Sequence, residues 1–293
     1  MSCTSADTAT KELTERQFLQ FRELISSKTG IALRDTKCAM LSARLQRRLR
    51  FLNLTSFGDY YQFLLNQDPS GDERRELINC ITTNKTSFFR EPHHFAQLGQ
   101  LLQRSLDSGH SRRFTAWSAA CSTGEEPFSM LMALHDVLDR SSVKCGLSIL
   151  ASDIDTQVLQ AGRSAIYQES DIDTVPVQAR QRFLLRGTGS QVGRYRVKPE
   201  LREEVDFRQL NLIDPAWDVN STFDAIFCRN ALIYFERETQ NRILRRLISY
   251  LKPDGLLMVG HSEQLHWMTD VLELVGTTTY RMKDGISCSP CLP

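Results

Sequence analysis

The N-terminal part of the chain carries apolar residues at the spacing of amphipathic helices. Between residue 14 and about residue 90, apolar positions recur at helical intervals. Two such stripes are Phe18, Phe21, Leu24 and Ile25, and then Leu41, Leu45, Leu49 and Leu52. Because each stripe needs a partner to cover it, the pattern predicts a small all-α domain over residues 14–90.

From residue 113 onward the pattern changes to short apolar runs that alternate with helical segments. The runs expected to form strands cover residues 114–119, 147–152, 223–228 and 256–260. Helices are expected at 125–138, 156–165 and 238–251, a turn at 252–255, and an antiparallel edge hairpin within 272–282. This alternation is typical of a mainly parallel sheet covered on both faces. The expected fold class is therefore α/β, with a doubly wound, Rossmann-like domain over residues 91–286.

A glycine-rich segment interrupts the alternation. Gly187, Gly189 and Gly193 are followed by strand-like stretches at 194–198 and 205–208. A nucleotide-binding glycine loop follows a strand and opens a helix, whereas these glycines precede a strand, so we reject that interpretation. The segment predicts a small inserted β subdomain at about residues 185–209. Its open edge could accept an extended peptide as an added strand, although an ordinary surface hairpin has the same pattern.

Composition and charge narrow the class of protein. The 293 residues are 41% hydrophobic and 24% charged, as in soluble globular proteins. A formal net charge of +1 gives no whole-molecule field that would indicate binding to nucleic acid or to a membrane surface. No apolar run approaches the length of a transmembrane helix, residues 1–10 lack the apolar core of a signal peptide, and no heptad pattern suggests a dimer. We therefore expect a cytoplasmic monomer without membrane insertion.

Neither the cysteines nor the histidines suggest a metal centre. The eight cysteines are scattered, and several lie in apolar runs, as reduced buried thiols do. Cys288 and Cys291 form a C-x-x-C pair near the C-terminus, which we interpret as a frayed tail. His93, His94 and His261 have no carboxylate or cysteine at ligand spacing, so no metal is expected.

Residues 117–127 carry the strongest chemical signal. An apolar strand breaks at a small-residue loop, 122–124, and a helix then opens with Glu125 and Glu126. A dinucleotide site would have a glycine triplet and no carboxylate beside the pyrophosphate. One glycine and two carboxylates instead suit a ligand with an amine, a sulfonium or ribose hydroxyls, of which S-adenosylmethionine is the common example. The alternative is an ordinary strand-loop-helix unit whose carboxylates only compensate the helix dipole.

Polar residues at the ends of the other predicted strands point to the same ligand, because ligands collect where the strands of a doubly wound sheet end. Asp153 follows the second strand, where a carboxylate can bind a ribose diol, and Asp155 is expected to cap the next helix. Asn211 and Leu212 could read an adenine edge. Together with Glu126, the candidate residues at these strand ends are Asp153, Asn211, Leu212, Arg229, Asn230 and Tyr234.

The segment of the helical domain at residues 34–50 has an excess of positive charge. Only Asp35 opposes the cations there, which are Arg34, Lys37, Arg44, Arg47, Arg48 and Arg50. Arg44, Arg47 and Arg48 share one helix face and would attract an acidic surface. A solvated helix face and a docking site for an acidic partner are both compatible with this pattern.

Several motifs follow one another along the chain. They are TTNKTSFFREPHHF at 82–95, WSAACSTGEEP at 117–127, ASDID at 151–155, FDAIFCRN with IYF at 223–235, and LKPDGLL with GHSE at 251–263. In these motifs the chain resembles the chemotaxis-receptor glutamate methyltransferases, the CheR family, from about residue 14 to 280. The resemblance implies a class I methyltransferase fold. It also implies an S-adenosylmethionine-dependent O-methyltransferase that esterifies glutamates on the helical cytoplasmic bundle of chemoreceptors, releasing S-adenosylhomocysteine.

The resemblance further implies roles for individual residues. The residues implied to line the cofactor are Asn84, Thr86, Arg90, Glu126, Asp153, Asn211, Leu212, Arg229 and Asn230. Arg90 and Tyr234 are implied to lie nearest the transferable methyl group. The residues implied to face the receptor are Arg44, Arg47, Arg48 and Arg50. The subdomain around Gly187, Gly189 and Gly193 is implied to tether a receptor's C-terminal peptide. Cys121 in the cofactor loop and the tail at 288–293 depart from the family pattern.

The residue chemistry agrees with this resemblance. A glutamate carboxylate is ionised at neutral pH, so its methylation needs no general base, and the chain has no Ser/His/Asp or Cys/His constellation. The reaction needs in-line placement of carboxylate and sulfonium. Arg90 could hold one carboxylate oxygen while Tyr234 orients the other or covers the methyl group.

Two other functions remain compatible with the sequence. A small-molecule methyltransferase of the same fold would need neither the basic helix nor the β insertion. A regulatory module that senses S-adenosylmethionine without catalysis would tolerate the loss of Arg90 and Tyr234, both of which are present. A nicotinamide dehydrogenase is disfavoured, because the loop lacks the second and third glycines.

Overall fold

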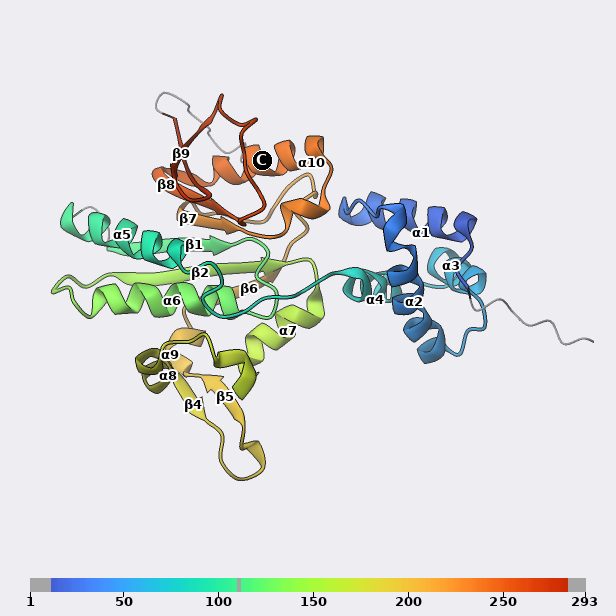
Figure 1. Cartoon of the computed structure of the whole chain (residues 1–293), viewed down its shortest axis with the longest axis horizontal. Helices are drawn as coiled ribbons and strands as arrows, with labels where there is room; N and C mark the ends of the chain where they lie inside the picture. Colours follow the sequence, from blue (N-terminus) through green and yellow to red (C-terminus); the bar gives the residue numbers. More distant parts are fainter. Residues whose placement is uncertain (1–11, 110–111, 284–293) are drawn as a thin grey trace, which may run out of the picture. The chain divides into compact units, whose positions relative to one another are not determined.

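The computed structural model describes residues 12–109 and 112–283 (Figure 1). The chain divides into two compact units, Met1–Thr83 and Asn84–Pro293, each of which is described by itself. The boundary expected from the sequence is residue 90. In the structure the segment from Asn84 belongs to the C-terminal unit, where Asn84 Nδ2 donates to Asp155 Oδ2 at 2.7 Å.

The N-terminal unit is built on the predicted apolar stripes. Its helices are α1 (Glu15–Thr29), α2 (Cys38–Leu52), α3 (Phe57–Asn66) and α4 (Asp72–Ile81), with a 3-10 turn η1 (Asp35–Lys37). α1 begins where Thr14 and Gln17 form a capping box that satisfies two free backbone N–H groups. Phe21, Leu45 and Tyr60 are fully buried in the core that the helices share. The predicted all-α domain is confirmed.

The C-terminal unit is organised around one large sheet. Within the described residues this sheet has the strand order β6-β2-β1-β7-β8-β10-β9. The strands are β1 (Arg113–Ser118), β2 (Gly146–Asp153), β6 (Val205–Gln209), β7 (Phe223–Cys228), β8 (Leu251–Val259), β9 (Leu272–Gly276) and β10 (Thr279–Met282). β6, β2, β1, β7 and β8 run parallel, and β10 pairs antiparallel with both β8 and β9. The mainly parallel sheet and its antiparallel edge hairpin are as expected.

Helices cover both faces of this sheet. They are α5 (His93–Asp107), α6 (Glu125–Leu138), α7 (Thr156–Ser164) and α10 (Arg237–Ser249). Neighbouring residues of β7 face opposite ways, so Phe227 packs in the core with α5, α6 and α7, and Ile226 packs in the core with α10. This arrangement confirms the doubly wound fold. None of the described helices is both long and apolar enough to cross a membrane.

A second, smaller sheet lies in the insertion after α7. It has the antiparallel order β3-β5-β4, with β3 (Ile166–Gln168), β4 (Leu184–Arg186) and β5 (Arg194–Val197). Between and after these strands come η2 (Glu169–Ile172), α8 (Val177–Phe183), η3 (Gly189–Gln191) and α9 (Pro199–Arg202). The assignment of residues 205–208 to this subdomain is wrong. They form β6, which pairs with β2 in the large sheet through Phe207 opposite Ala151, whereas β3 completes the small sheet.

The predicted turn at 252–255 is an irregularity within β8. The register between β7 and β8 shifts there, so Phe223 pairs with Leu251 but Ala225 pairs with Leu256. The extra residues of β8 form a bulge. Within it, Lys252 Nζ lies 2.7 Å from Asp224 Oδ2. β8 therefore begins earlier than the sequence suggests.

Candidate active site

The predicted loop at 122–124 lies between the end of β1, Ser118, and the start of α6, Glu125. Gly124 has a φ of 96° and precedes the first residue of α6. A Cβ at Gly124 would lie 3.0 Å from both the Gly162 Cα and the Tyr167 hydroxyl oxygen. This glycine is therefore required by backbone conformation and by packing inside the protein.

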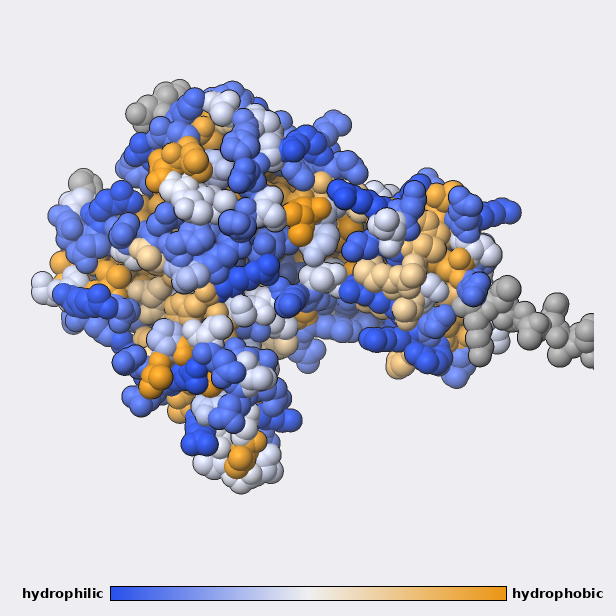
Figure 2. Space-filling view, viewed as in Figure 1, coloured by the Kyte–Doolittle hydropathy of each residue, from blue (hydrophilic) through white to orange (hydrophobic). Residues whose placement is uncertain are grey.

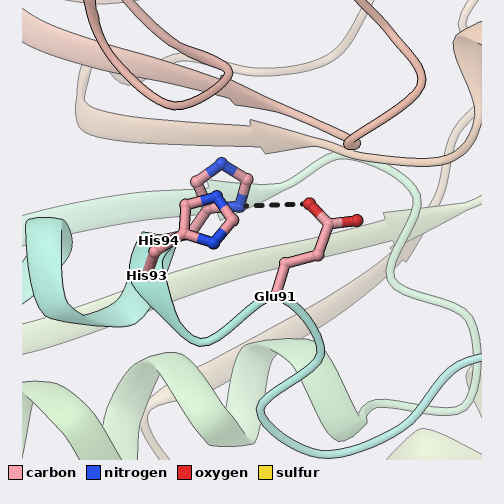
Figure 3. Close-up of side chains that lie close together, drawn as sticks. All are labelled: Glu91, His93 and His94. Atoms are coloured by element: carbon pink, nitrogen blue, oxygen red, sulfur yellow. Dashed lines mark ion pairs between the residues drawn. The ribbon is translucent and has the colours of Figure 1, made fainter.

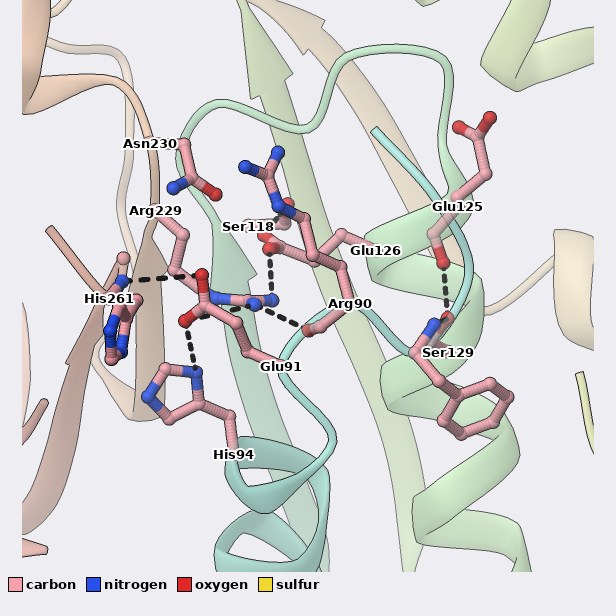
Figure 4. Close-up of polar contacts among 12 residues, drawn as sticks. Arg90, Glu91, His94, Ser118, Glu125, Glu126, Ser129, Arg229, Asn230 and His261 are labelled. Carbon is pink, nitrogen blue, oxygen red and sulfur yellow. Dashed lines mark hydrogen bonds and ion pairs between the residues drawn. The ribbon is translucent and has the colours of Figure 1, made fainter. Parts of the chain in front are cut away.

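Glu126 is held at the start of α6 by two fixed partners. Its Oε1 accepts a hydrogen bond from Ser118 Oγ at 2.7 Å, and its Oε2 lies 2.9 Å from Arg229 Nη1. Burial raises the pKa of Glu126, and Arg229 acts against that rise. Glu125 accepts from Thr123 Oγ1 at 2.6 Å, and its carboxylate is directed away from that of Glu126 (Figure 4). Of the two carboxylates, only Glu126 takes part in the buried charge cluster.

Arg229 links three segments beneath the candidate site. Its guanidinium pairs with Glu126, lies 3.4 Å from Glu91 Oε2 and donates to the Arg90 carbonyl (Figure 4). It also stands 5.8 Å from the ring centroids of Phe95 and Phe227. Both Nη nitrogens of the buried Arg229 side chain donate to protein groups, and the cofactor contact that the resemblance implies for it stays a prediction. These contacts give it a structural role in positioning Glu126 and the turn at 90–91.

Asp153 ends β2 beside the same loop. Its Oδ2 accepts from the Ser122 N–H at 2.9 Å and its Oδ1 from the Asp155 N–H at 3.0 Å. Burial raises the pKa of Asp153. Asp155 caps α7 by accepting from the N–H groups of Gln157 and Val158, which confirms its predicted role. The two aspartates differ because Asp153 is the last residue of β2, whereas Asp155 directly precedes the first residue of α7.

The loop at 84–91 is tied to this region at both ends. Ser122 Oγ donates to the Asn84 carbonyl at 2.8 Å, and the Phe89 N–H donates to Ser129 Oγ at 2.9 Å. Phe89 and Glu91 both have left-handed backbones, with φ of 51° and 56°, which non-glycine residues rarely adopt. Thr86 lies in this loop and is partly exposed. In Figure 4 the Arg90 guanidinium and the Asn230 amide lie on the same side of the Arg229–Glu126 pair.

The segments after β6 and β7 carry the remaining predicted residues. Asn230 has a φ of 58°, and its N–H donates to Glu263 Oε2 at 2.7 Å. Tyr234 ends the 3-10 turn η4 (Leu232–Tyr234) and is partly exposed. Asn211 Oδ1 accepts from the Ile213 N–H at 3.3 Å, and Leu212 is buried. Asn211 and Leu212 thus shape a turn of their own.

Two family models match the chain, one in each unit. "CheR methyltransferase, all-alpha domain" matches residues 16–82, and "CheR methyltransferase, SAM binding domain" matches residues 84–281. The chain belongs to the CheR methyltransferase family. It is therefore an S-adenosylmethionine-dependent methyltransferase, as the residue pattern at the strand ends predicts.

Curated relatives of this CheR-family chain match it over nearly their full length. It is 43% identical over 267 residues to chemotaxis protein methyltransferase 2 of Pseudomonas aeruginosa, covering 91% of this chain and 93% of the relative. It is 44% identical over 270 residues to the chemotaxis protein methyltransferase of Escherichia coli, covering 92% of each. The relative from Borreliella burgdorferi, a chemotaxis protein methyltransferase, is 34% identical over 274 residues, covering 92% of this chain and 95% of the relative.

Two imidazoles and a carboxylate form a cluster beside Arg229 that was not expected from the sequence. Glu91, His93 and His94 each offer a donor atom, all within 4.8 Å of one another (Figure 3). The expectation that these histidines lack a nearby carboxylate is wrong, because the left-handed turn at Glu91 folds it back. Burial lowers the pKa of His94 to about 3, and its Nε2 is 3.0 Å from Thr278 Oγ1. A cation here would face the Arg229 guanidinium, so the cluster does not favour a metal.

The four arginines that the resemblance assigns to receptor binding fall into two groups in the structure, two with partners inside the N-terminal unit and two that are exposed. Arg44 Nη1 donates to the carbonyls of Ile81 and Thr82 at 2.6 and 2.8 Å, which closes the C-terminal end of α4. Arg48 makes a two-pronged contact with Glu73 at 2.9 and 2.5 Å. These two side chains hold the N-terminal unit together. Arg47 and Arg50 are exposed.

Gly187, Gly189 and Gly193 form the turn between β4 and β5 of the small sheet. Gly189 and Gly193 have left-handed backbones, with φ of 56° and 82°. A Cβ at Gly187 would lie 2.0 Å from the Gln191 carbonyl oxygen, so this position also excludes a side chain. Val192, at the turn, is 70% exposed, and Figure 2 shows apolar surface at the tip of this lobe. The turn therefore presents an apolar side chain to its surroundings.

Proposed function

We propose that this CheR-family methyltransferase esterifies glutamate side chains of chemoreceptors and so adjusts sensory adaptation. The observation that carries the proposal is the buried acidic strand-end site in a chain whose relatives, over nearly their whole length, are named chemotaxis protein methyltransferases. We further propose that it acts as a monomer in the cytoplasm, where the helical bundle of a receptor is accessible.

The donor set fits S-adenosylmethionine. Asp153 presents a carboxylate whose oxygens have further lone pairs for ribose hydroxyls, and Glu126 adds negative charge for an amine or a sulfonium. Asn84, Thr86, Asn230, Asn211 and Leu212 are proposed to complete the binding site. When bound, S-adenosylmethionine supplies the methyl group and leaves as S-adenosylhomocysteine.

Arg90 is the proposed anchor for the substrate carboxylate. Among the described residues its side chain makes one hydrogen bond, from Nη1 to the Lys85 carbonyl at 3.0 Å. Its Nε and Nη2 groups are therefore able to donate to both oxygens of a glutamate. Tyr234 is proposed to orient the acceptor oxygen. A glutamate carboxylate is ionised at neutral pH, so the chain needs to supply position and charge but no base.

Two surfaces are proposed to select the receptor. Arg47 and Arg50, with Arg34 and Lys37, offer cations to an acidic helical bundle, and their effect should weaken with salt. The small sheet, with its turn at 187–193, is proposed to hold a receptor's C-terminal peptide by strand addition. Each surface would raise the local concentration of substrate without touching the reacting atoms.

Transfer of a radiolabelled methyl group to purified receptor cytoplasmic fragments tests the proposal. Mild base should release the label as methanol, because carboxyl esters hydrolyse under conditions that leave N-methyl groups intact. Binding of S-adenosylhomocysteine without transfer to any receptor fragment would contradict the proposal. It would favour a different substrate or a sensing role.

A further inference from the structure

A buried carboxylate, Glu263, joins the loops that follow β7 and β8. Its Oε2 accepts from the Asn230 N–H at 2.7 Å and the Gly260 N–H at 2.6 Å, and its Oε1 from the Ile233 N–H at 3.2 Å. The residue is 5% exposed. Burial raises the pKa of Glu263, and these backbone N–H groups act against the rise. The carboxylate therefore accepts hydrogen bonds from three backbone N–H groups that would otherwise lack a partner.

These contacts fix Asn230, which precedes η4, and the turn η4 itself, which ends at Tyr234. Asn230 takes a left-handed backbone, φ 58°, which costs free energy unless the surroundings hold it. Its N–H points at Glu263, which supplies that support. Ile233 lies in the middle of η4, directly before Tyr234, so the second carboxylate oxygen anchors the turn that carries the tyrosine.

Gly260 allows the loop after β8 to approach Asn230, in the loop after β7, closely. A Cβ at this position would lie 2.5 Å from Asn230 Nδ2, 2.8 Å from the Asn230 nitrogen and 2.7 Å from Glu263 Oε2. Any side chain would displace the Asn230 amide or the carboxylate. The glycine and the carboxylate, which are close in sequence, thus enclose Asn230 from two directions.

We propose that Glu263 is a positioning residue for methyl transfer, acting on cofactor binding through Asn230 and on the substrate carboxylate through the turn of Tyr234. The inference deepens the proposed function and rests on it for the role of Tyr234. Oε2 accepts from Asn230 and Gly260 and Oε1 from Ile233, so the two effects are separable by substitution.

The substitution Glu263→Gln separates the effect on cofactor binding from the effect on methyl transfer. An amide oxygen can replace Oε2 towards Asn230 and Gly260, but the amide nitrogen then meets the Ile233 N–H, donor against donor. We expect kcat to fall about tenfold or more, while the Kd for S-adenosylhomocysteine changes by less than about threefold. Glu263→Ala removes both sets of acceptors, so both kcat and the Kd should worsen by about tenfold or more.

Asp224→Asn is the matched control. Asp224 lies at the opposite end of β7 from Asn230, and its Oδ2 accepts from the Thr115 N–H at 2.8 Å and lies 2.7 Å from Lys252 Nζ. Its substitution disturbs a carboxylate of the same sheet, away from the site, and should leave kcat and the Kd unchanged even where it lowers the melting temperature.

The measurements are calorimetric titration with S-adenosylhomocysteine, steady-state transfer to a receptor fragment, and thermal unfolding of the full chain. The inference is overturned if Glu263→Gln retains wild-type kcat, or if Asp224→Asn loses as much kcat at an equal shift in melting temperature. If the wild type binds S-adenosylhomocysteine but transfers no methyl group, the proposed function fails. The Kd of Glu263→Ala then still decides the binding half of the inference, and an unchanged Kd overturns it.

Discussion

Replacing Arg229 by methionine tests the buried charge cluster beneath the candidate site. The Arg229 side chain is 2% exposed and pairs with Glu126 at 2.9 Å and with Glu91 at 3.4 Å. Methionine keeps much of the apolar contact but removes the charge and leaves both carboxylates buried. Removing one partner of a buried ion pair typically costs about 3–5 kcal/mol. We expect the free energy of unfolding of the C-terminal unit to fall by that amount at neutral pH.

The deficit should depend on pH. In the wild type, burial raises the pKa of Glu126 and Arg229 opposes that rise, so the pKa should climb further in Arg229→Met. A carboxyl group whose pKa is raised on folding stabilises the protein below its unfolded pKa, about 4.3, and this stability is lost as the pH rises through the folded pKa. The variant should therefore recover part of its lost stability as the pH falls from about 7 towards about 5.

Tryptophan fluorescence during urea unfolding isolates this unit, because all three tryptophans, Trp117, Trp217 and Trp267, lie beyond Asn84. Arg208→Met is the control, since it removes an ion pair with Asp206 whose side chains are 48% and 54% exposed. Such a pair contributes at most about 1 kcal/mol. The reasoning is refuted if the two variants unfold at the same urea concentration, or if the deficit of Arg229→Met does not shrink on acidification.

Three further predictions concern separate surfaces of the protein. Arg90→Ala should lower kcat by about a hundredfold and change the Kd for S-adenosylhomocysteine by less than about threefold, and near-normal turnover would remove Arg90 from catalysis. Arg47→Ala combined with Arg50→Ala should weaken association with receptor fragments and reduce its salt dependence, measured by surface plasmon resonance, without changing the melting temperature. Arg48→Met should instead destabilise the N-terminal unit by about 3 kcal/mol, because Glu73 stays buried beside the Tyr60 hydroxyl. Helical circular dichroism during thermal unfolding checks this, and an unchanged melting curve would contradict it.

Much of the fold is visible in the sequence because a buried strand is a local run of apolar residues. Residues 223–228 have this pattern, and they form the buried central strand β7. The pairing of β6 is not visible, since its half-polar pattern suits the edge of either sheet and tertiary contacts decide between them. β3 is too short to show any period, so its place in the small sheet could not be predicted either.

For the candidate site, the sequence identifies the strand ends but not the partners. Glu126, Asp153 and Asn230 come to one edge of the sheet because parallel strands end there. Arg229 and Glu126 are 103 residues apart, and no local pattern shows that the arginine is buried against the carboxylate. The same holds for Arg48, whose partner Glu73 lies in another helix. From the sequence alone, a charged residue on a helix is expected to be exposed to solvent, and only its partner shows that it is buried.

The most direct test of the account is to find which atom receives the methyl group. A receptor cytoplasmic fragment incubated with this protein and S-adenosylmethionine would be digested and analysed by tandem mass spectrometry, before and after mild base. We expect methyl esters on glutamate side chains that base removes, formed about a hundredfold more slowly with Arg90→Ala. Methyl groups that resist base, or that lie on lysine or arginine nitrogen, would contradict it.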